Sequence, residues 1–151
     1  MNKYNSNRKS EDLLEGISFI MSNKVKAVLV PSLFSGLIYE IILNKNIIHL
    51  NSDLPEFINT KFLSTFNSGK KSENQVSPYK DYLFKSRTNL AARLSRLIIE
   101  EFNYDDVRKQ ADWLSEYISN ADDSMMQKSE FVSKSKKKTD LSSEIMDWTA
   151  R

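Results

Sequence analysis

Residues that form tight turns are scarce in this chain, whose 151 residues include only three glycines and three prolines. Hairpin turns depend strongly on glycine, and so do the loops that cradle phosphates. The chain therefore has little material for repeated sharp reversals, which favours helices over sheets. Because 151 residues also fit a single domain of ordinary size, we predict a mainly α-helical protein built as one compact bundle of about five helices.

Five segments repeat apolar residues at helical spacing, namely 11–22, 32–45, 54–66, 79–102 and 104–120. The first begins behind Ser10, a capping hydroxyl, and the fourth contains a second cap at Ser86, where we expect a break. Two runs rich in β-branched residues, 24–30 and 46–50, could pair as a short two-stranded β element.

Composition divides the chain into three parts. Residues 1–9 are polar and predicted to be disordered, while residues 10–120 carry the helical periodicity and form the predicted domain. From residue 121 the sequence becomes polar and includes SKSKKK at 133–138, so we predict that residues 121–151 are a flexible tail.

One segment of this tail has the pattern of a docking motif. Leu141, Ile145 and Trp148 recur at i, i+4 and i+7, so residues 139–149 could form a short amphipathic helix. Tryptophan is enriched among residues that dominate binding, and such anchors fit the groove of a partner. These three residues are candidate partner-binding residues, and the motif could equally fold back onto its own domain.

Several classes of protein are excluded by what the chain lacks. It has no cysteine, hence no disulfide, thiolate zinc site or cysteine nucleophile. The polar N-terminus has no apolar stretch of the kind a signal peptide requires. The most apolar run, 27–43, contains Pro31 and Gly36 and is shorter than the roughly 20 residues that span a bilayer. We predict a cytoplasmic protein with no membrane segment, and we expect 27–43 to lie in the core.

The sequence also predicts that the protein is not an enzyme. His49 is the single histidine, and a lone histidine between isoleucines and a leucine is usually structural. No glycine-rich phosphate loop, nucleophile elbow or metal-ligand spacing is present. Neighbouring acids such as Glu100 and Glu101 point about 100° apart on a helix, which does not suit an acid–base pair. We therefore assign no catalytic residue, metal site or cofactor.

Charge is distributed unevenly along the chain. Residues 61–99 carry eight Lys or Arg against two acids, a formal charge of +6, and residues 100–125 carry eight acids against two bases, a formal charge of −6. Within the basic region Lys85, Asn89, Arg93 and Arg96 fall within about 80° of one another around a helix. They are displaced from the Leu and Ile stripe, so they are expected to form one exposed basic face.

This basic face is the best candidate for a functional site. Lysine and arginine neutralise phosphates, and asparagine can read base edges. Arg87 lies at the start of the second half of this helix, where backbone amides also attract phosphate. The segment SRTNLAARL, residues 86–94, has the polar start of a recognition helix. We therefore take Lys85, Arg87, Asn89, Arg93 and Arg96 as candidate nucleic-acid-binding residues.

A structural interpretation competes with this one. The arginines could simply pair with acids of the next helix, such as Asp105, Asp112 and Glu116, on a solvated surface. We therefore carry two functional hypotheses. The first is a non-enzymatic DNA-binding accessory or regulatory protein that contacts duplex DNA and recruits a protein partner through its tail. The second is an adaptor or structural subunit of a larger assembly without nucleic-acid contact. Homo-oligomerisation stays open under both.

Overall fold

The computed structural model describes the backbone of residues 10–138 and the side chains of residues 10–121. Its α-helices are α1 (Ser10–Ile20), α2 (Val30–Leu43), α3 (Ser64–Asn67), α4 (Arg87–Glu101) and α5 (Tyr104–Lys138). Four short 3-10 helices join them: η1 (Ala27–Leu29), η2 (Asn51–Asp53), η4 (Ser72–Asn74) and η5 (Asp81–Lys85). A π-helix, η3 (Glu56–Leu63), leads directly into α3. The described residues contain no strand, and the predicted mainly α fold is confirmed.

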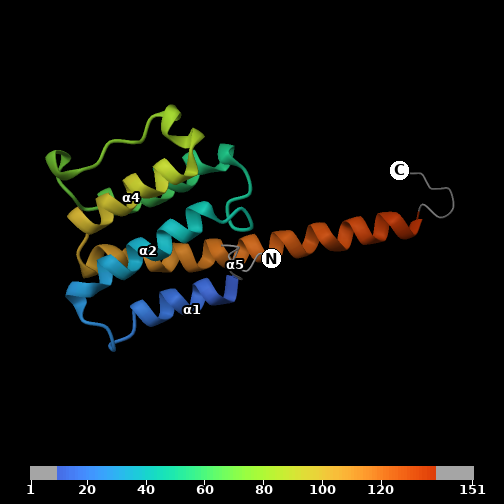
Figure 1. Ribbon diagram of the computed structural model, residues 1–151, viewed down its shortest axis with the longest axis horizontal. Coiled ribbons are helices and arrows are strands. Elements are labelled where there is room, and N and C mark those ends of the chain that lie inside the picture. The colour runs from blue at the N-terminus through green and yellow to red at the C-terminus, as the bar shows by residue number, and fades with distance from the viewer. Residues whose placement is uncertain (1–9, 139–151) are drawn as a thin grey trace. The chain divides into compact units, whose positions relative to one another are not determined.

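Helix α2 is the central element, because it packs against α4 on one side and α1 on the other (Figure 1). Each helix contributes the apolar stripe that its spacing predicts, as expected for amphipathic helices around one core. The buried residues are Leu13, Ile17 and Ile20 of α1, Val30, Phe34, Ile38, Ile41 and Ile42 of α2, and Leu90, Ala91, Leu94 and Ile98 of α4. Residues 27–43 thus supply much of the core, as the sequence predicts.

Four phenylalanines from different segments stack inside this core. The ring of Phe62 in η3 lies 6.4 Å from that of Phe34 in α2 and 5.6 Å from that of Phe102, which follows α4. Phe66 in α3 stacks on Phe102 at 4.6 Å between centroids. The cluster therefore ties η3, α3, α2 and the end of α4 together.

The first four turns of α5 complete the core. Val107, Ala111, Leu114 and Ile118 are buried on one face. Gln110 is also buried, and its side-chain amide donates to the carbonyl of Phe62 at 2.9 Å and accepts from the Trp113 indole at 2.7 Å. Because these partners satisfy the amide, a polar residue is tolerated in the core.

Helix α5 extends beyond the end that periodicity predicts. The sequence suggests a helix over 104–120, whereas α5 continues to Lys138. The chain divides into two compact units, Met1–Ser119 and Asn120–Arg151. The predicted flexibility of 121–151 stays a prediction. Residues 1–9, predicted to be disordered, and the motif 139–149 lie outside the described residues.

The two-stranded β element suggested for 24–30 and 46–50 does not form. Residues 27–29 form η1, closed by a bond from the Leu29 amide to the Lys26 carbonyl, and Val30 begins α2 with a proline in its first turn. The second run folds into a turn, because the amides of Ile47 and Ile48 both donate to the Asn44 carbonyl. Local turn bonds thus use the groups that a ladder would need.

The fourth predicted helix is split where its internal cap suggests. Residues 81–85 form η5, and α4 begins behind Ser86, whose hydroxyl accepts from the Asn89 amide at 3.2 Å. The break at Ser86 is confirmed, but the part before it is a 3-10 helix and not an α-helix. Among the described residues, no helix is long and apolar enough to cross a bilayer.

Candidate nucleic-acid interface

Helix α4 presents one face to α2 and the opposite face outward. Leu90, Leu94 and Ile98 are buried on the inner face, and the Ser95 hydroxyl adds a bond of 3.3 Å to the Ser35 carbonyl of α2. Since residues three and four apart share a helix face, the same packing directs Asn89, Arg93 and Arg96 outward, and all three are exposed.

These three side chains line one open groove of about 760 Å³. Its other wall is the segment that precedes α4 and runs beside it (Figure 1). The lining residues are Tyr79, Tyr82, Leu83, Ser86, Asn89, Ala92, Arg93, Arg96, Leu97 and Glu100. We call this feature the α4 groove. It combines two cations and an amide with two aromatic rings.

The wall of the α4 groove is anchored to η3 by one asparagine. The Asn59 side chain accepts from the Tyr79 amide at 2.8 Å and donates to the Tyr79 carbonyl at 3.1 Å. Asn67 of α3 holds Val76 in the same bidentate way, at 2.8 and 2.9 Å. A side-chain amide that pairs with both backbone groups of a residue fixes an extended segment much as a neighbouring strand would.

Electrostatics in the α4 groove are mixed. Burial raises the pKa of the Tyr79 hydroxyl, and the positive charge of Arg93 partly opposes that rise. Arg96 pairs with Glu100 on its own helix at 2.8 Å, between exposed side chains. Within the described part of the chain Arg93 makes no ion pair, so its charge is not neutralised by a neighbouring acid.

The ion pairs of the described residues differ from those that a purely structural role of the basic face would predict. The sequence allowed the arginines of this helix to pair with Asp105, Asp112 or Glu116 of the next helix. In the described residues Arg96 pairs instead with Glu100, and the partner of Asp105 is Arg108, at 3.5 Å. Surface pairs of this kind contribute little to stability, typically about 0–1 kcal/mol.

Arg87, which the sequence suggests as a phosphate contact, is buried in the protein and belongs to no outer surface. Only 8% of Arg87 is exposed. Its guanidinium donates to the Ile42 carbonyl at 2.8 Å, the Ile48 carbonyl at 2.6 Å and the Asn51 side chain at 2.7 Å. The cation thereby satisfies a carbonyl at the end of α2, where a positive charge is favoured. Desolvation lowers the pKa of the Arg87 guanidinium, and the charges of Asp53 and Tyr117 oppose that effect.

Lys85 is also separated from the stripe. It is exposed, but it belongs to η5, before the Ser86 cap, so it does not share the register of α4. It is absent from the lining of the α4 groove, which therefore brings together three of the five predicted residues. The other predicted contacts, Leu141, Ile145 and Trp148, lie outside the described residues.

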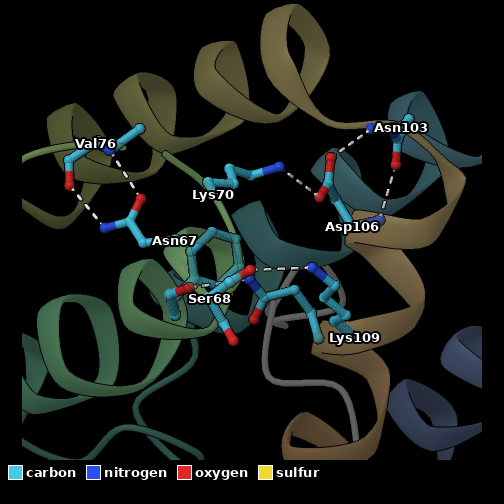
Figure 2. Close-up of polar contacts among 9 residues, drawn as sticks. Asn67, Ser68, Lys70, Val76, Asn103, Asp106 and Lys109 are labelled. Atoms are coloured by element: carbon cyan, nitrogen blue, oxygen red, sulfur yellow. Dashed lines mark hydrogen bonds and ion pairs between the residues drawn. The ribbon is translucent and has the colours of Figure 1, made fainter. Parts of the chain in front are cut away.

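A second polar cluster joins the segment after α3 to the start of α5 (Figure 2). Asn103 and Asp106 cap α5 reciprocally, since each side chain accepts from the other residue's amide at 3.0 Å. Asp106 is buried and also meets the Lys70 ammonium at 3.2 Å, while Lys109 donates to the Ser68 carbonyl at 3.3 Å. Within this cluster the polar groups satisfy one another, which gives it a structural role.

Sequence reasoning missed Tyr79, Tyr82 and Asn59. The tyrosines lie in the first part of the predicted helix 79–102, where the helical pattern gives no sign of a groove wall, and Asn59 precedes Tyr79 by 20 residues. Because the two residues of this bidentate contact are so far apart in the chain, no local sequence pattern reveals it. Asn59 stands with two other polar residues, Thr60 and Lys61, between apolar neighbours, so the sequence does not single it out.

No protein-family model, curated protein or solved structure matches this chain significantly. Among the residues whose side chains are described, no group of three or more acids or histidines is arranged to hold a metal ion.

Proposed function

We propose that this protein is a non-enzymatic DNA-binding accessory or regulatory protein that contacts nucleic acid through the α4 groove. The observation that carries the proposal is the gathering of Asn89, Arg93 and Arg96 in one open groove. Arginine binds phosphate oxygens through a planar fork of donors, and an exposed amide can pair with a base edge. In this role Arg93 and Arg96 anchor the backbone, and Asn89 faces the bases.

The charge pattern supports the same surface. The region that contains α4 carries the excess of positive charge, and the acids that follow from residue 100 lie at or beyond the helix end. A nucleic-acid backbone is attracted to the basic region around α4 and repelled by the acids from residue 100 onward. The groove therefore favours a polyanion near Arg93 and disfavours one beyond Glu100.

Replacing both groove arginines, Arg93→Ala with Arg96→Ala, should weaken DNA binding about tenfold or more, since each charge-assisted hydrogen bond typically contributes ~1.5–3 kcal/mol. The slope of log affinity against log salt should also fall by about 0.7–0.9 for each phosphate that the variant no longer neutralises. Fluorescence anisotropy with labelled single-stranded and duplex oligonucleotides over a salt series measures both quantities.

The matched control is Lys24→Ala with Lys26→Ala, which removes two exposed positive charges from the connection between α1 and α2. It changes the net charge equally and leaves the α4 groove intact. Equal loss of affinity in both double variants would mean that binding follows net charge and not this site. Unchanged affinity of the groove variant would remove the proposal.

The second candidate function is an adaptor that binds another protein. It is favoured by apolar side chains left exposed beside the α1–α2 contact, where Phe19 and Leu33 line a groove of about 360 Å³. Exposed apolar surface of this kind often marks a protein contact. The tail residues Leu141, Ile145 and Trp148 would supply a second contact, on sequence grounds alone.

Under the adaptor hypothesis, deleting residues 139–151, or replacing Phe19→Ser with Leu33→Ser, should each abolish co-purification of a partner from the native host. The expected physical cause is the loss of apolar anchors, which dominate binding energy. Mass spectrometry after nuclease treatment measures the partner, and circular dichroism checks the fold. A partner retained by both variants would argue against an adaptor.

A further inference from the structure

The α4 groove is lined by two arginines and two tyrosines. Resting on the proposed function, we infer that it binds single-stranded nucleic acid, with a base stacked on Tyr82 while Arg93 and Arg96 hold the backbone. The observations that support this inference are the groove lining, the exposure of Tyr82 and the anchoring of the Tyr79 segment.

The surface around α4 is broader than a single helix. An α-helix with its side chains is about 10–12 Å across and by itself fills a major groove about 12 Å wide. Along α4 the Tyr79 and Tyr82 segment lies directly beside the helix and lines the same groove as Arg93 and Arg96. The adjoining segment makes this surface broader than one helix, which disfavours insertion of α4 alone into a major groove.

The α4 groove also carries an exposed aromatic ring. Tyr82 is 63% exposed, whereas the Phe34, Phe57 and Phe62 rings are fully buried. Bases stack on an exposed ring irrespective of sequence, and proteins that bind single strands combine such rings with a positive groove. In a duplex the base faces are covered by their neighbours, so this ring offers a favourable contact only to an unpaired base.

The wall that carries this ring is preorganised. Asn59 fixes both backbone groups of Tyr79, three residues before Tyr82, and Tyr79 itself is half-buried. The wall is therefore held in place before a ligand arrives. Less ordering is needed on binding, which favours affinity.

The test compares oligo(dT) with a duplex of equal length, using the full chain and anisotropy. Single strands should bind more tightly, and Tyr82→Ala should weaken that binding about fivefold to hundredfold while weakening duplex binding less. Tyr82→Phe keeps the ring and should retain affinity. Phe19→Ala, which removes another exposed ring far from the α4 groove in sequence, is the matched control.

The outcomes separate this inference from the proposed function. Duplex bound as tightly as, or more tightly than, oligo(dT) would overturn the single-strand inference while the α4 groove remained a DNA site. Single-strand binding that is unchanged in Tyr82→Ala, or lost equally in Tyr82→Phe, would also overturn it. Binding of neither probe would overturn both.

Discussion

Replacing Arg87 with methionine is expected to lower the free energy of unfolding by about 3–5 kcal/mol, although methionine preserves much of the apolar bulk of the side chain. The reason is that Arg87 donates to three acceptors, the carbonyls of Ile42 and Ile48 and the side chain of Asn51. Without the guanidinium these acceptors lose their charged donor in a place that water reaches poorly. Urea denaturation followed by circular dichroism measures the change.

Two further variants define what Arg87 contributes. Arg87→Lys keeps the charge but loses the planar fork, so it should be destabilised by an intermediate amount. Arg93→Met makes the same chemical change at an exposed position of α4 and should alter stability by no more than about 0.5 kcal/mol. If Arg87→Met proved as stable as Arg93→Met, the three bonds would contribute nothing measurable to the fold.

Arg87 is buried and Arg93 is exposed on the same helix, and the sequence predicts this difference only in part. Arg87, Leu90, Leu94 and Ile98 lie three, four and four residues apart, which is the spacing of the buried face. Register alone therefore indicates an inward Arg87. The residue type instead indicates that Arg87 is exposed, because an arginine is rarely buried unless its donors find partners. Those partners lie 36 to 45 residues earlier, where no local pattern reveals them.

The helices themselves were predictable because each buries one face on a neighbour. α1, α2 and α4 follow the apolar spacing of the sequence, and the cap at Ser86 lies where its hydroxyl indicates. The β prediction for 24–30 and 46–50 is wrong, because backbone groups in both runs form local bonds, in η1 and in the turn at Asn44, instead of a ladder. β-propensity describes fit to a partly buried surface, and tertiary context decides which surface forms.

The candidate site was predictable in its helical half only. Asn89, Arg93 and Arg96 share a face by virtue of helix geometry, which a sequence displays directly. The opposite wall depends on Asn59 holding Tyr79 across 20 residues. A sequence therefore indicates a basic face, but the groove that this face forms with the Tyr79 segment emerges only from the tertiary fold.

Phe62→Ala is the second substitution with a large expected effect, a loss of about 3–5 kcal/mol in the free energy of unfolding. Phe62 is fully buried and stacks on both Phe34 and Phe102. Its removal leaves a cavity at the contact between η3 and α2, and the Phe66–Phe102 stack loses one neighbour. Large-to-small changes cost most where the surroundings cannot collapse, and a core shared by four segments has little freedom to do so.

The position of Phe62 also decides which control is informative. Phe19→Ala removes the same atoms from a ring that is 54% exposed, so its effect should stay below about 1 kcal/mol. Phe62→Leu keeps part of the volume and should lie between the two. If the phenylalanine cluster organises the fold, thermal and urea unfolding should show the smallest loss of stability for Phe19→Ala, a larger loss for Phe62→Leu and the largest for Phe62→Ala. If Phe62→Ala were as stable as Phe19→Ala, the same deletion would have the same effect at a buried and at an exposed ring. The phenylalanine cluster would then not be the centre of the core.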